Sequence, residues 1–155
     1  MIEGVTLRRL TPLRDDRGEL CEMLRSDDPI FERFGQVYYT TVKPGVVKAW
    51  HYHQRQTDHL VTIGAPAVIA LCDGRDGSPT KGEVMELVAG REAPVLVRIP
   101  PGVYHGFTAA GDEEAMILNV PTEPYDRDHP DEFRLDPFEN HIPYDWRAKG
   151  ATRGH

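Results

Sequence analysis

The stretch GVVKAWHYHQRQTDHL, residues 45–60, contains three of the seven histidines of the chain and one carboxylate, Asp58. A KPG turn precedes residues 46–53, which therefore predict a β-strand. Because side chains alternate across a strand, His51 and His53 share one face of it. Such histidines are candidates for metal ligands, for acid–base catalysts or for hydrogen-bonded core residues.

The composition restricts the class of protein. A chain of 155 residues with 39% hydrophobic side chains is of the usual size for one domain. Its formal charge of −7 disfavours binding to nucleic acid or to an anionic membrane. Two separated cysteines, Cys21 and Cys72, indicate neither a disulfide framework nor a thiolate zinc site. No signal-like or membrane-length apolar run occurs, and we expect a soluble cytoplasmic protein.

Short apolar stretches separated by turn residues predict an all-β fold. Strands are expected within 3–10, 19–25, 36–43, 46–53, 59–72, 82–88, 94–100, 105–110 and 114–121. So many strands in one small domain favour a sandwich or barrel. The single expected helix of the first half is a short turn over 26–34. Proline and charge dominate from residue 121 onward, so we expect an extended C-terminal tail. A single domain over 1–146, followed by a disordered tail over 147–155, is predicted.

Two motifs make the fold prediction specific. The spacing of Gly45, His51, His53 and Asp58 resembles the first cupin motif, with aspartate in place of its glutamate. The stretch PPGVYH, which ends at His105, resembles the second motif. The resemblance implies a cupin double-stranded β-helix, a jelly-roll barrel.

A metal site is one interpretation of these motifs. His51, His53, Asp58 and His105 would supply three imidazoles and a carboxylate to zinc, iron or manganese if all four converged. Simple alternation, however, places Asp58 on the face opposite His51 unless residues 54–57 turn the chain.

A longer series of motifs points to one family. The stretches DDRGELCE, GVVKAWHYHQ, DGRDGSPTKGE, IPPGVYHGF and PTEPYDRDHPDEFRLDP follow in this order between residues 15 and 137, and IPYDW ends at residue 146. The series resembles the dTDP-4-dehydrorhamnose 3,5-epimerase family. The resemblance implies epimerisation of a nucleotide-linked 4-keto-6-deoxyhexose at C3, C5 or both, in deoxysugar or polysaccharide biosynthesis, without metal or other cofactor.

The resemblance also implies roles for individual residues. His51 is the expected base and Tyr125 the expected acid, which suits removal and return of a proton beside a ketone. The remaining positions that match the family's substrate contacts are Arg17, Glu22, Gln36, Lys48, His59, Asp73 and His105. In the family, the segment that corresponds to residues 15–22 reaches into the neighbouring subunit, which implies a homodimer.

The chain departs from the family at three points. Lys48 replaces an arginine, and His53 is an additional histidine. The C-terminal aspartate that orients the family's base has no counterpart, which leaves Asp73 or Asp58 as candidates to orient His51. Two alternatives therefore stay open. One is a metal-dependent cupin, either a sugar isomerase or a dioxygenase, and the other is a non-catalytic sugar-binding cupin.

Overall fold

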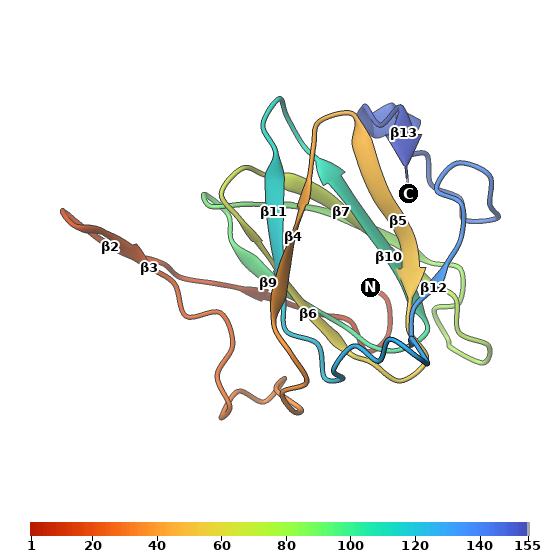
Figure 1. Ribbon diagram of the computed structural model, residues 1–155, viewed down its shortest axis with the longest axis horizontal. Helices are drawn as coiled ribbons and strands as arrows, with labels where there is room; N and C mark the ends of the chain where they lie inside the picture. The colour runs from red at the N-terminus through yellow and green to blue at the C-terminus, as the bar shows by residue number, and fades with distance from the viewer. Residues whose placement is uncertain (155) are drawn as a thin grey trace.

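The computed structural model describes residues 1–154 and confirms the all-β prediction (Figure 1). One sheet has the strand order β1-β9-β6-β11-β4, and the other has the order β12-β5-β10-β7-β8. A third, separate pair of strands, β2 and β3, forms a hairpin that projects from the barrel. The bounds are β1 Thr6–Arg9, β2 Leu13–Asp15, β3 Gly18–Leu20, β4 Tyr38–Val42, β5 Val46–Tyr52, β6 Asp58–Ile63, β7 Ala67–Asp73, β8 Val84–Ala89, β9 Val95–Ile99, β10 Val103–Ala109, β11 Ala115–Asn119, β12 Phe133–Arg134 and β13 Arg153–Gly154.

The core lies between the two larger sheets, as in a jelly-roll barrel. Leu60, Val97 and Ile117 of the first sheet pack with Ile69 and Leu71 of the second. Burial of this apolar surface is the main stabilising contribution to a barrel of this size. The strand pattern agrees with the predicted cupin double-stranded β-helix.

The helix expected over residues 26–34 is not formed. Within residues 1–154 the helical structure is one 3-10 turn, η1 (Arg147–Lys149), and no helix is long and apolar enough to cross a membrane. The segment instead makes isolated turns around Asp28, whose carboxylate pairs with Arg8 at 2.6 Å. That carboxylate also accepts a hydrogen bond from the backbone amide of Arg25 at 2.7 Å. These contacts hold the chain against β1 rather than in a helix.

Residues 147–154, which belong to the expected disordered tail of residues 147–155, form the turn η1 and the strand β13. Residue 155 lies outside the described residues. The strand β13 pairs parallel with β5, and the amide of Thr152 donates to the Gly45 carbonyl at 2.9 Å. The rings of Trp50 and Trp146 lie 5.2 Å apart in a second apolar cluster under this segment. The tail therefore covers the outer face of the second sheet.

A bulge in β5 decides which of its side chains enter the barrel. Two residues of β5, Ala49 and Trp50, lie opposite the single residue Gly106 of β10. The additional residue reverses the alternation, so Lys48 before the bulge and His51 after it both face the interior cavity. A Cβ atom on Gly106 would lie 2.2 Å from the Cβ of Ala49, so a residue larger than glycine does not fit there.

Candidate active site

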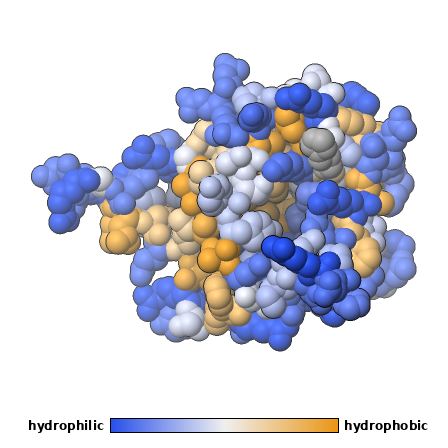
Figure 2. Space-filling model, in the orientation of Figure 1, coloured by the Kyte–Doolittle hydropathy of each residue, from blue (hydrophilic) through white to orange (hydrophobic). Residues whose placement is uncertain are grey.

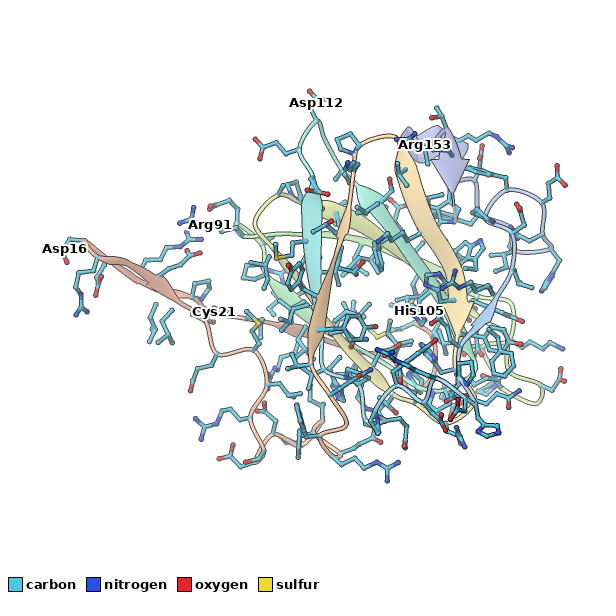
Figure 3. The ribbon with its side chains drawn as sticks, viewed as in Figure 1. Asp16, Cys21, Arg91, His105, Asp112 and Arg153 are labelled. Atoms are coloured by element: carbon cyan, nitrogen blue, oxygen red, sulfur yellow. The ribbon has the colours of Figure 1, made fainter. Side chains whose placement is uncertain are left out.

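A cavity of about 1030 Å³ lies within the barrel. Strand β5 contributes Lys48 and His51 to its wall, His53 follows directly after the end of β5, and β10 contributes His105. The segment that follows β11 brings Tyr125 to the cavity, and 55% of the surface of this tyrosine remains exposed. Figure 3 shows His105 at the end of the barrel where β5 and β10 lie side by side.

Five of the residues predicted from the sequence line this one cavity. They are His51, Tyr125, Gln36, Lys48 and His105. Residues 74 positions apart in the chain, such as His51 and Tyr125, are thus brought to the same space. The arrangement provides a concave site with several polar side chains, as expected for a small-molecule site.

His59 is placed outside the cavity, contrary to the expectation that it contacts substrate. Its side chain is buried, with Nδ1 3.0 Å from the Val120 carbonyl oxygen and Nε2 3.0 Å from that of Ile30. Alternation along β6 is the reason, because its neighbour Asp58 takes the inward face. The contact of His59 with the Ile30 carbonyl holds the segment around Ile30 against the barrel.

Asp73 is also placed away from the cavity, where it organises the loop of residues 74–82. Its carboxylate accepts hydrogen bonds from Arg75 Nε at 2.8 Å, Ser78 Oγ at 2.6 Å and Thr80 Oγ1 at 2.6 Å. These donors hold the pKa of Asp73 well below its ordinary value, with the Arg75 hydrogen bond as the largest cause. Asp73 therefore does not orient His51 in this structure.

Arg17 and Glu22 lie far from the cavity of their own chain. Arg17 is at the tip of the β2–β3 hairpin with 85% of its side chain exposed, and it pairs with Asp15. Glu22 follows the hairpin and pairs with Arg25 at 3.2 Å. Figure 3 shows the neighbouring Asp16 at the end of the hairpin that is remote from His105. Arg17 therefore does not contribute to the cavity of its own chain.

His53, Asp58 and His105 form a cluster in which the two histidines line the cavity and Asp58 is buried. The carboxylate oxygen Oδ2 of Asp58 lies 3.2 Å from Nε2 of His53 and 3.4 Å from Nε2 of His105. Of the two placements of Asp58 that the sequence left open, the structure has the one in which residues 54–57 turn the chain before β6 begins and Asp58 meets the histidines. Three of the four residues considered as metal ligands therefore converge, and His51 is not one of them.

Burial and neighbouring charges shift the pKa values of the cluster. Burial opposes a charged His53, but the hydrogen bond and charge of Asp58 outweigh it and raise the pKa of His53 to about 9. Burial likewise opposes ionisation of Asp58, but the hydrogen bond from His53 prevails and lowers its pKa to about 2. Burial lowers the pKa of His105. The protein alone thus holds a charged His53 beside an ionised Asp58.

His51 has a different environment. Burial, followed by the neighbouring His105, lowers the pKa of His51 to about 4, so its ring is neutral at pH 7. Its ring centre lies 6.1 Å from that of His105. Among residues 1–154, no carboxylate is paired with His51, and no group makes a hydrogen bond with its ring nitrogens. Asp58, the other candidate to orient His51, pairs with His53 and His105 instead.

Lys48 is a cation of the cavity wall whose charge is not neutralised by a carboxylate in the described residues. Its Nζ donates to Thr40 Oγ1 at 2.8 Å. In the described part of the chain it has no carboxylate partner, whereas Arg33 pairs with Glu123 and Arg134 pairs with Glu132 at 2.6 Å.

Several residues of the site were not predicted. The side chain of Asp131 accepts hydrogen bonds from the amides of residues 54, 55 and 56 at 2.9, 2.9 and 3.0 Å, and so holds the turn that precedes Asp58. Asn119 donates to Asp58 Oδ1 at 2.8 Å and to the Tyr38 hydroxyl at 3.0 Å. Tyr38 could have been predicted from the sequence, because it lies two residues after Gln36 and alternation along a strand puts both side chains on the same face. Asp131 could not, since it approaches the turn only through the tertiary fold.

The Asp73 network leads to a prediction about stability. Asp73→Asn should lower the free energy of unfolding at neutral pH by about 2–4 kcal/mol, because an amide cannot accept all these hydrogen bonds and leaves Arg75 unpaired. A carboxyl with a lowered pKa stabilises the fold above its unfolded-state pKa of about 3.9, and this contribution is lost as the pH falls below that value. Urea denaturation should therefore show a difference at pH 7 that shrinks below about pH 4. Equal stabilities at pH 7 would contradict this role.

Comparisons with known proteins agree with the architecture of the site. Residues 13–133 match the family described as the polysaccharide biosynthesis C-terminal domain. The spore coat polysaccharide biosynthesis protein SpsL of Bacillus subtilis is 37% identical over 149 residues, which cover 96% of this chain and 99% of SpsL. The probable low-salt glycan biosynthesis epimerase Agl13 of Haloferax volcanii is 41% identical over 150 residues, which cover 96% of each chain.

A solved structure is also similar to this chain over most of its length. A crystal structure of a dTDP sugar isomerase from Desulfovibrio desulfuricans superposes with a TM-score of 0.88 at 34% identity, and the match covers 94% of this chain and 92% of the isomerase. These similarities extend over the barrel and over the strands that carry His51 and His105. The chain belongs to the polysaccharide biosynthesis C-terminal domain family, and it is a cupin-fold member that is related to sugar epimerases and isomerases.

Proposed function

We propose that the protein epimerises a nucleotide-linked 4-keto-6-deoxyhexose, with His51 as the base and Tyr125 as the acid. The observation that carries this proposal is that both side chains line one cavity, while the ring nitrogens of His51 have no protein partner in the described chain. Because the proposed substrate carries a nucleotide, we place the reaction in the cytoplasm.

The reaction consists of two proton transfers. His51 removes the proton from the carbon beside the ketone, and the electron pair moves into an enolate whose oxygen was the keto oxygen. Tyr125 donates its hydroxyl proton to the opposite face of that carbon, which inverts the configuration. To complete the cycle, His51 releases the removed proton to solvent and solvent returns a proton to Tyr125, whose exposure at the cavity rim provides the access.

Lys48 is proposed to bind the diphosphate of the substrate. Its ammonium group lines the same cavity and has no carboxylate partner in the described residues. A lysine attracts phosphate as a point charge and lacks the bidentate geometry of the arginine at the family position. Gln36 lies in the same wall and can donate hydrogen bonds to the nucleotide portion.

The proposal is tested by NMR in D2O with a panel of nucleotide-linked 4-keto-6-deoxy sugars. Deuterium should enter the substrate at C3, C5 or both, and new epimers should accumulate. A sugar that binds in the cavity without exchange would identify a non-catalytic sugar-binding protein instead.

The β2–β3 hairpin supports the further proposal of a homodimer. Leu13 and Leu20 on this hairpin are 68% and 58% exposed, and an isolated two-stranded hairpin is marginally stable in water. Figure 2 shows hydrophobic surface at the base of the projecting hairpin and beside it on the barrel. A second copy would cover the leucines and receive Arg17 near its cavity.

We expect sedimentation at micromolar concentration to show a dimer. The double substitution Leu13→Asp and Leu20→Asp should shift the protein to the monomer, because the dimer interface would then bury unpaired charge. Arg17→Ala should leave the dimer intact and weaken nucleotide-sugar binding. A wild-type monomer with undiminished substrate binding would refute the shared site.

A further inference from the structure

Residues 33–36, just before β4, lie against the start of the segment that carries Tyr125. The backbone amides of Gly35 and Gln36 both donate to the Pro121 carbonyl, at 3.0 and 3.4 Å. Pro121 is buried and only four positions before Tyr125. We call residues 33–36 and 121–123 the junction, because they hold the two segments together beside the cavity.

Gly35 is the point of the junction where a larger residue does not fit. A Cβ atom on Gly35 would lie 2.5 Å from the backbone nitrogen of Glu123 and 2.6 Å from the carbonyl carbon of Thr122. Gly35 is not in the left-handed conformation, so close approach rather than backbone conformation requires glycine here. Since the opposing atoms belong to the backbone, a side chain at position 35 would displace residues 122 and 123.

An ion pair also connects the two parts of the junction. The guanidinium of Arg33 pairs with the carboxylate of Glu123, and both side chains line the cavity. The Arg33 side chain is 64% exposed, and a pair so open to solvent contributes only about 0–1 kcal/mol to folding. Arginine nevertheless binds a carboxylate with a defined geometry, so the pair restricts the position of Glu123. Tyr125 is two residues further along the chain.

Beyond the junction, few polar contacts restrain Tyr125. Residues 124–130 are all exposed. In the described part of the chain, the hydrogen bonds and ion pairs of this stretch are those of Asp126 with residues 128 and 129. The next polar contact with the barrel is that of Asp131, whose carboxylate accepts from the amide of Gln54 at 2.9 Å. The junction is thus the nearest anchor on the N-terminal side of Tyr125.

We propose that Arg33 and Gly35 are positioning residues, which act through Glu123 to hold Tyr125 at the cavity. The inference rests on the proposed function, in which Tyr125 is the acid. A proton donor acts only within hydrogen-bond reach of the reacting group, and a displacement of about 1 Å can reduce a rate about 100-fold. The ring of Tyr125 makes no hydrogen bond within residues 1–154, so its placement depends on the chain that carries it.

The base does not share this dependence. His51 belongs to β5, which makes no hydrogen bond to either part of the junction in the described residues. Disturbing the junction should therefore impair the return of a proton on the opposite face and leave proton removal in place. This difference separates a positioning role from a general effect on folding, which would lower both steps together.

The first test measures deuterium exchange and inversion by NMR in D2O at saturating nucleotide-linked sugar. Arg33→Gln and Gly35→Ala should each lower the ratio of inversion to exchange about 10- to 100-fold. Arg33→Glu should have the same effect, because it places two carboxylates together. Adding Glu123→Arg to Arg33→Glu restores opposite charges and should recover most of the lost ratio.

Gly111→Ala is the matched control for Gly35→Ala. Gly111 lies between β10 and β11, and a Cβ atom there would meet nothing within 4 Å. Its backbone is not in the left-handed region either. The control makes the same chemical change without a close approach, and it should keep both rates.

The second test uses no substrate. In protein labelled with 3-fluorotyrosine at its six tyrosines, loss of one ¹⁹F resonance in Tyr125→Phe identifies the signal of Tyr125. Arg33→Gln and Gly35→Ala should shift or broaden this signal. They should leave that of Tyr144, which packs in the outer tryptophan cluster, unchanged. Gly111→Ala should change neither signal.

Together, the two tests distinguish the positioning role from the assignment of the acid. If the junction variants move the Tyr125 signal but Tyr125→Phe still inverts the sugar, the junction positions Tyr125 and another group is the acid. If neither Arg33→Gln nor Gly35→Ala moves the signal, the positioning proposal is wrong. It is also wrong if Tyr125→Phe loses inversion while both junction variants keep the ratio of the wild type.

Discussion

His51→Ala should reduce epimerisation about 100- to 10,000-fold, the usual effect of removing a general base. Incorporation of solvent deuterium at the carbon beside the ketone should decrease by the same factor, because no enolate forms without proton removal. Both quantities come from one NMR time course in D2O. His51 is half-buried in the cavity wall and makes no recorded hydrogen bond through its ring in the described chain, so we expect the variant to fold.

His129→Ala is the matched control for this experiment. It removes an imidazole from an exposed loop outside the cavity, and it should keep both rates. His51→Asn, which retains a polar side chain without a base, should be as inactive as His51→Ala. If either His51 variant exchanges deuterium within a few-fold of the wild type, another group is the base.

Tyr125→Phe should separate exchange from inversion. The variant retains the ring at the cavity rim and loses only the hydroxyl, so His51 can still form the enolate and return a proton to the original face. Deuterium exchange should therefore continue, while formation of the inverted sugar falls about 100-fold or more. The ratio of exchange to inversion in the same NMR experiment measures the effect.

Tyr38→Phe is the informative comparison, because it deletes the other tyrosine hydroxyl of this cavity. That hydroxyl accepts a hydrogen bond from Asn119, and burial raises the pKa of Tyr38 to about 12. Its proton is therefore harder to release than that of an ordinary tyrosine. If Tyr38→Phe separates exchange from inversion and Tyr125→Phe does not, the acid is Tyr38 and the assignment of Tyr125 is wrong.

The barrel could be predicted because strand alternation and turn residues are local features of the sequence. Alternation and turn residues located most of the strands, and the spacing of two histidine motifs indicated the cupin fold. The run over residues 59–72 was expected as one apolar stretch, and the structure divides it at Gly64–Pro66 into β6 and β7. The ordered C-terminal segment was missed because its pairing with β5 and the packing of Trp146 depend on residues about 100 positions earlier.

The site was predictable where it follows strand periodicity and motif position. His51, Gln36, Lys48 and His105 reached the cavity as expected. The position of Asp58 depends on a turn fixed by Asp131, more than 70 residues later, so strand alternation alone could not decide which face Asp58 takes. His59 was misplaced for the complementary reason, since adjacent residues of one strand cannot both face inward.

Because of the bulge in β5, the number of residues in this strand decides which of its side chains face the cavity. Deleting Ala49 would restore a continuous two-residue repeat, and the side chains on one side of the deletion would exchange faces. Either Lys48 would leave the cavity, or His51 and His53 would turn toward the outer tryptophan cluster. A single-codon deletion at this point would therefore remove from the cavity either Lys48, the proposed phosphate contact, or His51, the proposed base, together with His53, although all three residues would remain in the sequence. Comparisons among relatives should accordingly count the residues between Lys48 and His51 as carefully as they compare the residues themselves.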